Sequence, residues 1–106
     1  MLSKKYRLSS TDIEHIKEHS SRAHSPFFTI LYKKNNKEFP RIAVIISKKI
    51  SKKAVRRNAI RRLLKAKLKE KIDSLPNQDY VVIVKTGTEI HEKAAEELIN
   101  LITTCR

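Results

Sequence analysis

The chain has 106 residues, 40% of them hydrophobic, and its 24 Lys and Arg residues against 11 Asp and Glu give a net charge of +13. This apolar content excludes a disordered basic tail, and the length predicts a single domain, residues 1–106. The lone cysteine, Cys105, excludes a disulfide scaffold and fits a reducing cytoplasm. We expect neither a signal peptide nor a membrane span, because no apolar run is long enough. A charge this large predicts a polyanionic partner, and nucleic acid is the first candidate.

The N-terminal part of the chain predicts one helix and two strands. Residues 9–12 offer N-cap side chains immediately before IEHIKEH, whose isoleucines form a narrow apolar stripe. Aromatic and β-branched runs at 27–33 and 41–47 predict strands, and the Asn- and Pro-containing segment between them predicts a turn. We therefore expect these two strands to pair in antiparallel fashion, with room for a short extra strand at 21–25.

The C-terminal part predicts a long helix, a strand and a last helix. Ser51 offers an N-cap to the long helix, and residues 79–85 form another apolar strand. The only glycine, Gly87, predicts a turn, after which Thr88 can cap the last helix. Apolar residues at helical spacing define the long helix through Ala59, Ile60, Leu63, Leu64, Leu68 and Ile72, and the last helix through Ala94, Ala95, Leu98, Ile99 and Ile102.

The order of these elements predicts an α/β (α+β) two-layer sandwich. Its sheet is expected to be small and mixed, with three to four strands and about three helices. Continuous Val and Ile runs at 42–46 and 81–84 are typical of strands covered on both faces. The long helix between these two runs predicts a parallel strand-helix-strand crossover.

The segment SKKISKKAVRRNAIRR, residues 47–62, holds eight Lys or Arg residues and no acid. A charged helix face is often only solvated surface, but such a face mixes signs, whereas this one accepts like-charge repulsion and places cations at a helix N-terminus. A phosphate backbone relieves both penalties, and the Arg fork fits phosphate oxygens. We therefore predict that this segment binds nucleic acid, with Arg56 and Arg57 at the boundary between the apolar and basic faces of the helix.

The chemistry favours RNA over DNA as the partner. The sequence has no zinc-finger spacing, heptad array or clear helix-turn-helix, and a sheet with aromatic residues beside a basic helix suits structured or single-stranded RNA. Phe27, Phe28, Tyr32 and Tyr80 are candidates for stacking on bases. The alternative, which we favour for most of them, is that they belong to the core.

The run SKKISKKAVRRNAIRRL, preceded by RIAVII and followed by DYVVIV, resembles the protein subunit of bacterial ribonuclease P. The resemblance covers nearly the whole chain, since KKYRLS, TDIEHIK, SPFFTILYKK, the basic segment and the final amphipathic helix occur in the family's order. The family hallmark, Arg-Asn-Arg followed by an apolar and two basic residues, falls on Arg57, Asn58, Ala59, Ile60, Arg61 and Arg62. Ala59 replaces the second Arg, so the RNA contact credited to that arginine is not made by this residue. Ile13, and Ile16 or Lys17, stand where the family commonly presents phenylalanines toward a cleft.

The resemblance implies a protein that assists an endoribonuclease without carrying its chemistry. In the family, the catalytic RNA and its bound Mg²⁺ hydrolyse the phosphodiester at the 5′ end of mature tRNA within precursor tRNA. We expect no cofactor on the protein alone, and Mg²⁺ in the RNA–protein holoenzyme. The implied partners are the ribonuclease P RNA and precursor tRNA, with no membrane and no obligate protein partner, in the cytoplasm.

Two sets of residues acquire roles from this resemblance. Those implied to face the catalytic RNA are Lys48, Lys49, Lys52, Lys53, Arg56, Arg57, Asn58, Arg61, Arg62 and Lys65. Those implied to line a cleft for the 5′ leader are Arg7, Ile13, Lys17, Phe27, Thr29 and Leu31.

The residues themselves also favour a non-catalytic protein. His15 and His19 stand one helical turn apart, but Ile16 occupies the position where the zinc-protease motif requires Glu. The lone glycine builds no phosphate loop, and the sequence shows no carboxylate cluster for metal ions. A structural RNA-binding protein, such as a small ribosomal protein, shares the charge and the sandwich and is the alternative, whereas a DNA-binding architectural protein shares only the charge.

Overall fold

The computed structural model describes residues 4–46, 53–85 and 92–105. In chain order its elements are a 3₁₀ turn (Lys4–Tyr6), α1 (Ser10–Glu18), β1 (Ser21–His24), β2 (Phe28–Lys34), β3 (Arg41–Ile45), α2 (Ala54–Lys71), a second 3₁₀ turn (Ile72–Ser74), β4 (Gln78–Val84) and α3 (Glu92–Thr104). The predicted helices and strands are all present, and the short extra strand is β1.

The four strands form one mixed sheet in the order β1-β2-β4-β3. β1 and β2 pair in antiparallel fashion, β2 and β4 do the same, and β3 runs parallel to β4, which confirms the crossover through α2. The expected pairing of β2 with β3 is wrong, because β4 lies between them. Strands lie about 4.8 Å apart, so the connection from Lys34 to Arg41 is long enough to pass over one strand, and a polar turn does not by itself imply a tight hairpin.

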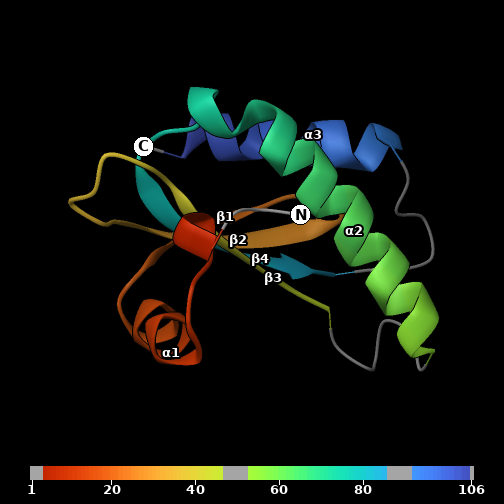
Figure 1. The fold of residues 1–106 in the computed structure, drawn as a ribbon, viewed down its shortest axis with the longest axis horizontal. Coiled ribbons are helices and arrows are strands. Elements are labelled where there is room, and N and C mark those ends of the chain that lie inside the picture. The colour runs from red at the N-terminus through yellow and green to blue at the C-terminus, as the bar shows by residue number, and fades with distance from the viewer. Residues whose placement is uncertain (1–3, 47–52, 86–91, 106) are drawn as a thin grey trace.

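Helices lie on both faces of the sheet (Figure 1). α2 and α3 cover one face, where a large cluster of buried side chains joins β2, β3 and β4 to both helices. α1 lies against the other face, where the buried cluster contains, among the described residues, Ile16, Leu31 and Val81. The sheet with α2 and α3 forms the two predicted layers. α1 adds a partial third layer, which leaves some of the second face of the sheet uncovered.

The two parallel strands differ in how completely they are covered. β4 is buried on both faces along nearly its whole length, as its apolar run predicts. In β3, by contrast, buried residues alternate with half-buried ones, so the same prediction is wrong for this strand. The reason is its place at the edge of the sheet, beyond most of α1.

The helix starts differ in how they are capped. Ser9, one of the four N-cap candidates at residues 9–12, caps α1 through a capping box with Asp12, in which the Ser9 hydroxyl accepts from the Asp12 amide at 3.2 Å and Asp12 accepts from the Ser9 amide at 3.1 Å. α2 begins after Lys53, whose side chain makes no capping hydrogen bond. The expected caps Ser51 and Thr88 lie outside the described residues. α2 therefore starts without a side-chain acceptor from its N-cap residue.

Within the three described ranges, no helix combines the length and the apolar character needed to cross a bilayer.

Candidate nucleic-acid interface

The long helix α2 presents two chemically different faces. Ile60, Leu64 and Leu68 are buried in the cluster shared with the sheet and α3. Leu63, which the periodicity assigned to the same stripe, is half-buried at its margin. The other positions of α2 are exposed or half-buried, and Glu70 is their only acid. One face of α2 thus packs while the other presents a dense array of cations.

Seven of the ten residues assigned to the catalytic RNA lie in the described part of the chain: Lys53, Arg56, Arg57, Asn58, Arg61, Arg62 and Lys65. Lys48, Lys49 and Lys52 lie outside it. Arg57 is half-buried, as expected at the boundary of the apolar face, whereas Arg56 is exposed. Arg61 Nη1 donates to Asn58 Oδ1 at 2.9 Å, which holds one guanidinium of the hallmark segment along the helix surface. The exposed Ala59 leaves this surface without a side-chain donor at its position.

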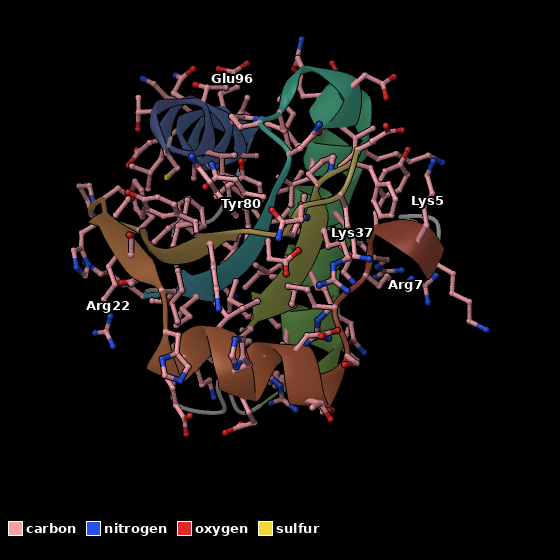
Figure 2. The ribbon with its side chains drawn as sticks, turned by 90° about the vertical axis from the view of Figure 1, so that its left-hand side faces the viewer. Lys5, Arg7, Arg22, Lys37, Tyr80 and Glu96 are labelled. Atoms are coloured by element: carbon pink, nitrogen blue, oxygen red, sulfur yellow. The ribbon has the colours of Figure 1, made fainter. Side chains whose placement is uncertain are left out.

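The pKa of Lys65 is affected by the cations that lie around it. Burial lowers the pKa of its ammonium, and the charges of Arg61 and Arg7 lower it further. The backbone of Arg7 forms an isolated parallel β-bridge with Ile42 of β3, and Arg7 lies on the α2 side of the molecule in Figure 2. The resemblance assigned Arg7 to the leader cleft, but its charge also adds to the basic face of α2. An array this repulsive is stabilised by a bound polyanion.

On the opposite face, α1 leaves part of the sheet open. Ile16 is buried on Leu31 and Val81, and these three residues fix α1 to the sheet. Residues paired across neighbouring strands share a face, so Thr29, Ile83 and Ile45 form a row on this same face, farther along the strands. All three of these row residues are half-buried. We call this row, Thr29, Ile45 and Ile83, the open strip.

The structure separates the residues that the resemblance assigned to the leader. Ile13 packs at the edge of the α1 cluster together with the isoleucines of the open strip, and Lys17 follows Ile13 by one helical turn and is exposed. Thr29 belongs to the strip itself. Leu31 is only 3% exposed beneath α1, so its role is to support the helix. Phe27 is half-buried and packs against the cluster on the α2 side, apart from the other residues of this set.

A buried polar network holds the start of α1 over the sheet. Asp79 is 6% exposed and accepts hydrogen bonds from Arg41 Nε at 2.9 Å and Arg41 Nη2 at 2.7 Å. Asn35 Nδ2 also donates to Asp79 at 2.9 Å, and Arg41 Nη1 lies 3.4 Å from Asp12 Oδ2. Hydrogen bonding to Asp79 raises the pKa of Arg41. This network was not predicted from the sequence, although an acid next to the apolar run of β4 indicates that a buried partner is needed.

The aromatic residues are largely internal. Phe28 and Tyr80 have no exposed surface, which confirms the prediction that they belong to the core, and Tyr80 lies between the sheet and α3 in Figure 2. Tyr32 is half-buried. Within the part of the chain that the structure describes, no three His, Cys, Asp or Glu side chains lie close enough to hold a metal ion.

Comparisons with known proteins agree with this geometry. The family model for ribonuclease P matches residues 2–105. The ribonuclease P protein component of Aliivibrio fischeri is 38% identical over 93 residues, which covers 88% of this chain and 74% of that protein. That of Vibrio vulnificus is 36% identical over 88 residues, covering 83% of this chain and 73% of the relative. The solved RNase P protein from Thermotoga maritima has the same fold, with a TM-score of 0.86 at 23% identity over 94% of this chain and 97% of that chain. The chain therefore belongs to the ribonuclease P protein component family.

Proposed function

We propose that this protein binds the ribonuclease P RNA through the basic face of α2 and guides the 5′ leader of precursor tRNA along the open strip beside α1. The protein is a component of an endoribonuclease that processes tRNA. In this assignment each RNA has its own surface on the protein, and the cleavage itself is carried out by the RNA and its Mg²⁺. The activity takes place in the cytoplasm. Family membership removes the ribosomal-protein alternative.

The observation that carries the proposal is the division of α2 into a packed face and a cationic face. Because Ile60, Leu64 and Leu68 fix the helix on the sheet, the backbone positions of its arginines are set before any RNA binds. Phosphates then gain charge-assisted hydrogen bonds with no cost for ordering the helix backbone. They also relieve the repulsion by Arg61 and Arg7 that, after burial, lowers the pKa of Lys65. The basic face of α2 is therefore expected to dominate affinity for the RNA subunit.

The open strip suits a single strand better than a duplex. Ile45 and Ile83 offer apolar contact to unstacked bases, and Lys17 on α1 supplies a cation for the backbone. The usual aromatic stacking platform is absent from these three positions, so affinity for the leader should depend on apolar contact and charge more than on stacking.

Mg²⁺ would supply the metal-assisted hydrolysis, activating water and stabilising the leaving oxygen. Among the described residues, Asp12 and Asp79 are held by Arg41, and their carboxylates serve the α1 network. The proposal accordingly places the metal ions with the RNA, and the role of the protein is to bind and orient.

The test is reconstitution of the purified protein with a cognate ribonuclease P RNA and precursor tRNA at low Mg²⁺. The protein should raise kcat/KM for leader removal well above that of the RNA alone. R57A/R62A should weaken binding to the RNA subunit and reduce the slope of log K against log salt by about 0.7 to 0.9 for each phosphate that the variant no longer binds. A matched control, K71Q/K93Q, removes two exposed charges, one at the C-terminal end of α2 and one on α3. If wild-type protein gave no stimulation, the proposed function would be wrong.

A further inference from the structure

A second basic surface lies at the far end of β2. Three hollows, of about 350, 420 and 290 Å³, share Lys34 in their walls, and the last two also share Lys33. Lys37, on the connection that follows, lines the first of them. In Figure 1 this connection projects at one end of the long axis, and the N-terminus of α2 lies toward the other end. We call Lys33, Lys34 and Lys37 the β2-end lysines.

The charge of the β2-end lysines is only partly neutralised by nearby acids. The largest hollow is lined by Lys33, Lys34 and Arg41 against Asp12 and Asp79, which both bind Arg41, so its lining keeps one net positive charge, and the charge of Lys37 also acts on Asp12. The other two hollows are each lined by two lysines and no acid. Among the described residues, no carboxylate lies within ion-pair distance of Lys33 or Lys34. The half-buried Lys33 instead places its Nζ 2.7 Å from His15 Nε2, which leaves a positive charge facing a hollow. Such an arrangement favours an anionic ligand.

This surface is separate from the open strip. Ile16 is 2% exposed and seals α1 onto Leu31 and Val81 in the middle of the sheet. Lys33 pairs with Asp79 on one side of this seal, and Thr29 pairs with Ile83 on the other. A ligand in the open strip therefore cannot reach Lys33 beneath α1; it must pass around or over the helix.

The hollows around the β2-end lysines are also lined by an aromatic ring and by amide side chains. Tyr32 is half-buried and lines the smallest hollow, where part of its ring can contact a base. Asn36 and Asn77 place amide groups in the first hollow. The connection is held in shape by Asn35, whose Oδ1 accepts from the Lys37 amide at 2.9 Å, and by the positive φ of 56° at Asn36. Cations, amides and an aromatic ring around hollows that share lining residues are groups that bind single-stranded RNA.

The geometry points to a second RNA-contact surface, in which the β2-end lysines bind phosphodiester groups of single-stranded RNA at the opposite side of α1 from the open strip. This inference rests on the proposed function, since it adds a second contact for RNA that α2 or the open strip already holds. Two sources share the chemistry: an unpaired segment of the RNA subunit, or the upstream part of a long 5′ leader that passes around α1.

The test uses the reconstituted holoenzyme and the variant K33Q/K34Q, which keeps part of the aliphatic stems and removes two charges. K71Q/K93Q is the matched control. Three affinities are measured across a salt series: the protein for the RNA subunit, and the holoenzyme for precursor tRNA with a long leader and with a leader of one nucleotide. One of the first two should weaken about five-fold beyond the control, with its salt slope reduced by about 1.4 for two phosphates.

Each pattern of results decides the question. A loss confined to the RNA subunit assigns the surface to that RNA, and a loss confined to the long leader assigns it to the upstream leader. Losses equal to the control in every arm overturn the inference. If K33Q/K34Q failed to fold by circular dichroism, K34Q/K37Q would replace it, because both of these side chains are exposed. A protein that stimulates cleavage normally but shows no loss in either variant refutes this surface alone and leaves the proposed function intact.

Discussion

The two faces of the sheet differ in how they are closed. In the part of the chain that the structure describes, 19 buried residues form one continuous cluster beneath α2 and α3, whereas three buried residues hold α1 on the opposite face. Hydrophobic stabilisation scales with the apolar area removed from water, so the closed face supplies most of the folding free energy. The other face needs only enough contact to position one helix. A small domain can therefore leave one sheet face open for a ligand when the opposite face alone provides the core.

The largest expected effect comes from breaking the closed face. Leu64→Ala should lower the free energy of unfolding by about 3 kcal/mol, because Leu64 is fully buried between α2 and the sheet and its truncation leaves a cavity. Denaturant titration followed by circular dichroism measures this change. Leu63→Ala, one residue away on the same helix and half-buried, is the matched control and should cost clearly less. Equal losses in the two variants would mean that the packed face of α2 is assigned incorrectly.

Breaking the open face should cost less stability and more function. Ile16→Ala should lower the free energy of unfolding by about 2 kcal/mol, at the low end for a buried isoleucine, because the small α1 cluster can relax. It should also loosen α1 beside the open strip. We expect the advantage of a long leader over a one-nucleotide leader in kcat/KM to shrink, while affinity for the RNA subunit stays near the wild-type value. A parallel loss of RNA-subunit affinity would contradict the separation of the two surfaces.

Elements that a single periodic pattern defines could be predicted from the sequence. The period of 3.6 located α2 and α3, and the Val- and Ile-rich runs located the strands. The neighbour of β2 could not be predicted in this way, because strand order depends on which strand can tolerate burial on both faces, and β4 lies between β2 and β3. Periodicity compares residues within one segment, whereas strand order is decided between segments.

The candidate site also contains some residues that could be predicted from the sequence and others that could not. The basic face of α2 could be predicted because its residues lie within one helix. The partners in the Arg41–Asp79 network could not, because they lie 29 to 44 residues apart in the chain. The β2-end lysines could not, because their charge matters only once it is known which nearby acids are paired. Phe27 was assigned by strand alternation, but it precedes the first residue of β2, where alternation does not apply.

Tyr80 makes the closed face sensitive to alkali. Burial raises the pKa of its phenol to about 12, and the hydroxyl donates to the Pro76 carbonyl at 2.9 Å. A pKa above its ordinary value of 10.0 gives stability that is complete below pH 10 and is lost as the pH rises toward 12. Tyr80→Phe should cost about 1 kcal/mol at neutral pH, and its stability should fall less steeply between pH 10 and 12 than that of the wild type. Parallel curves in denaturation experiments would exclude this role for Tyr80.

The capping box makes the open face sensitive to acid, with the smallest expected effect. Hydrogen bonds from Ser9 lower the pKa of the Asp12 carboxyl, and the charge of Arg41 lowers it further against the opposing effect of burial. A depressed pKa gives stability that is present above the ordinary value of 3.8 and is lost as the pH falls through the folded value. Ser9→Ala should therefore cost about 0.5 to 1 kcal/mol at neutral pH and less in acid, where wild-type Asp12 is protonated and its bonds are already weakened.

Ser10→Ala, inside the first turn, is the control. Hydrogen exchange should place the loss in α1 and leave α2 and α3 protected, because the cap stabilises only the helix that the small cluster holds. Exchange that increased equally on both faces of the sheet would mean that α1 and the large cluster unfold as one unit.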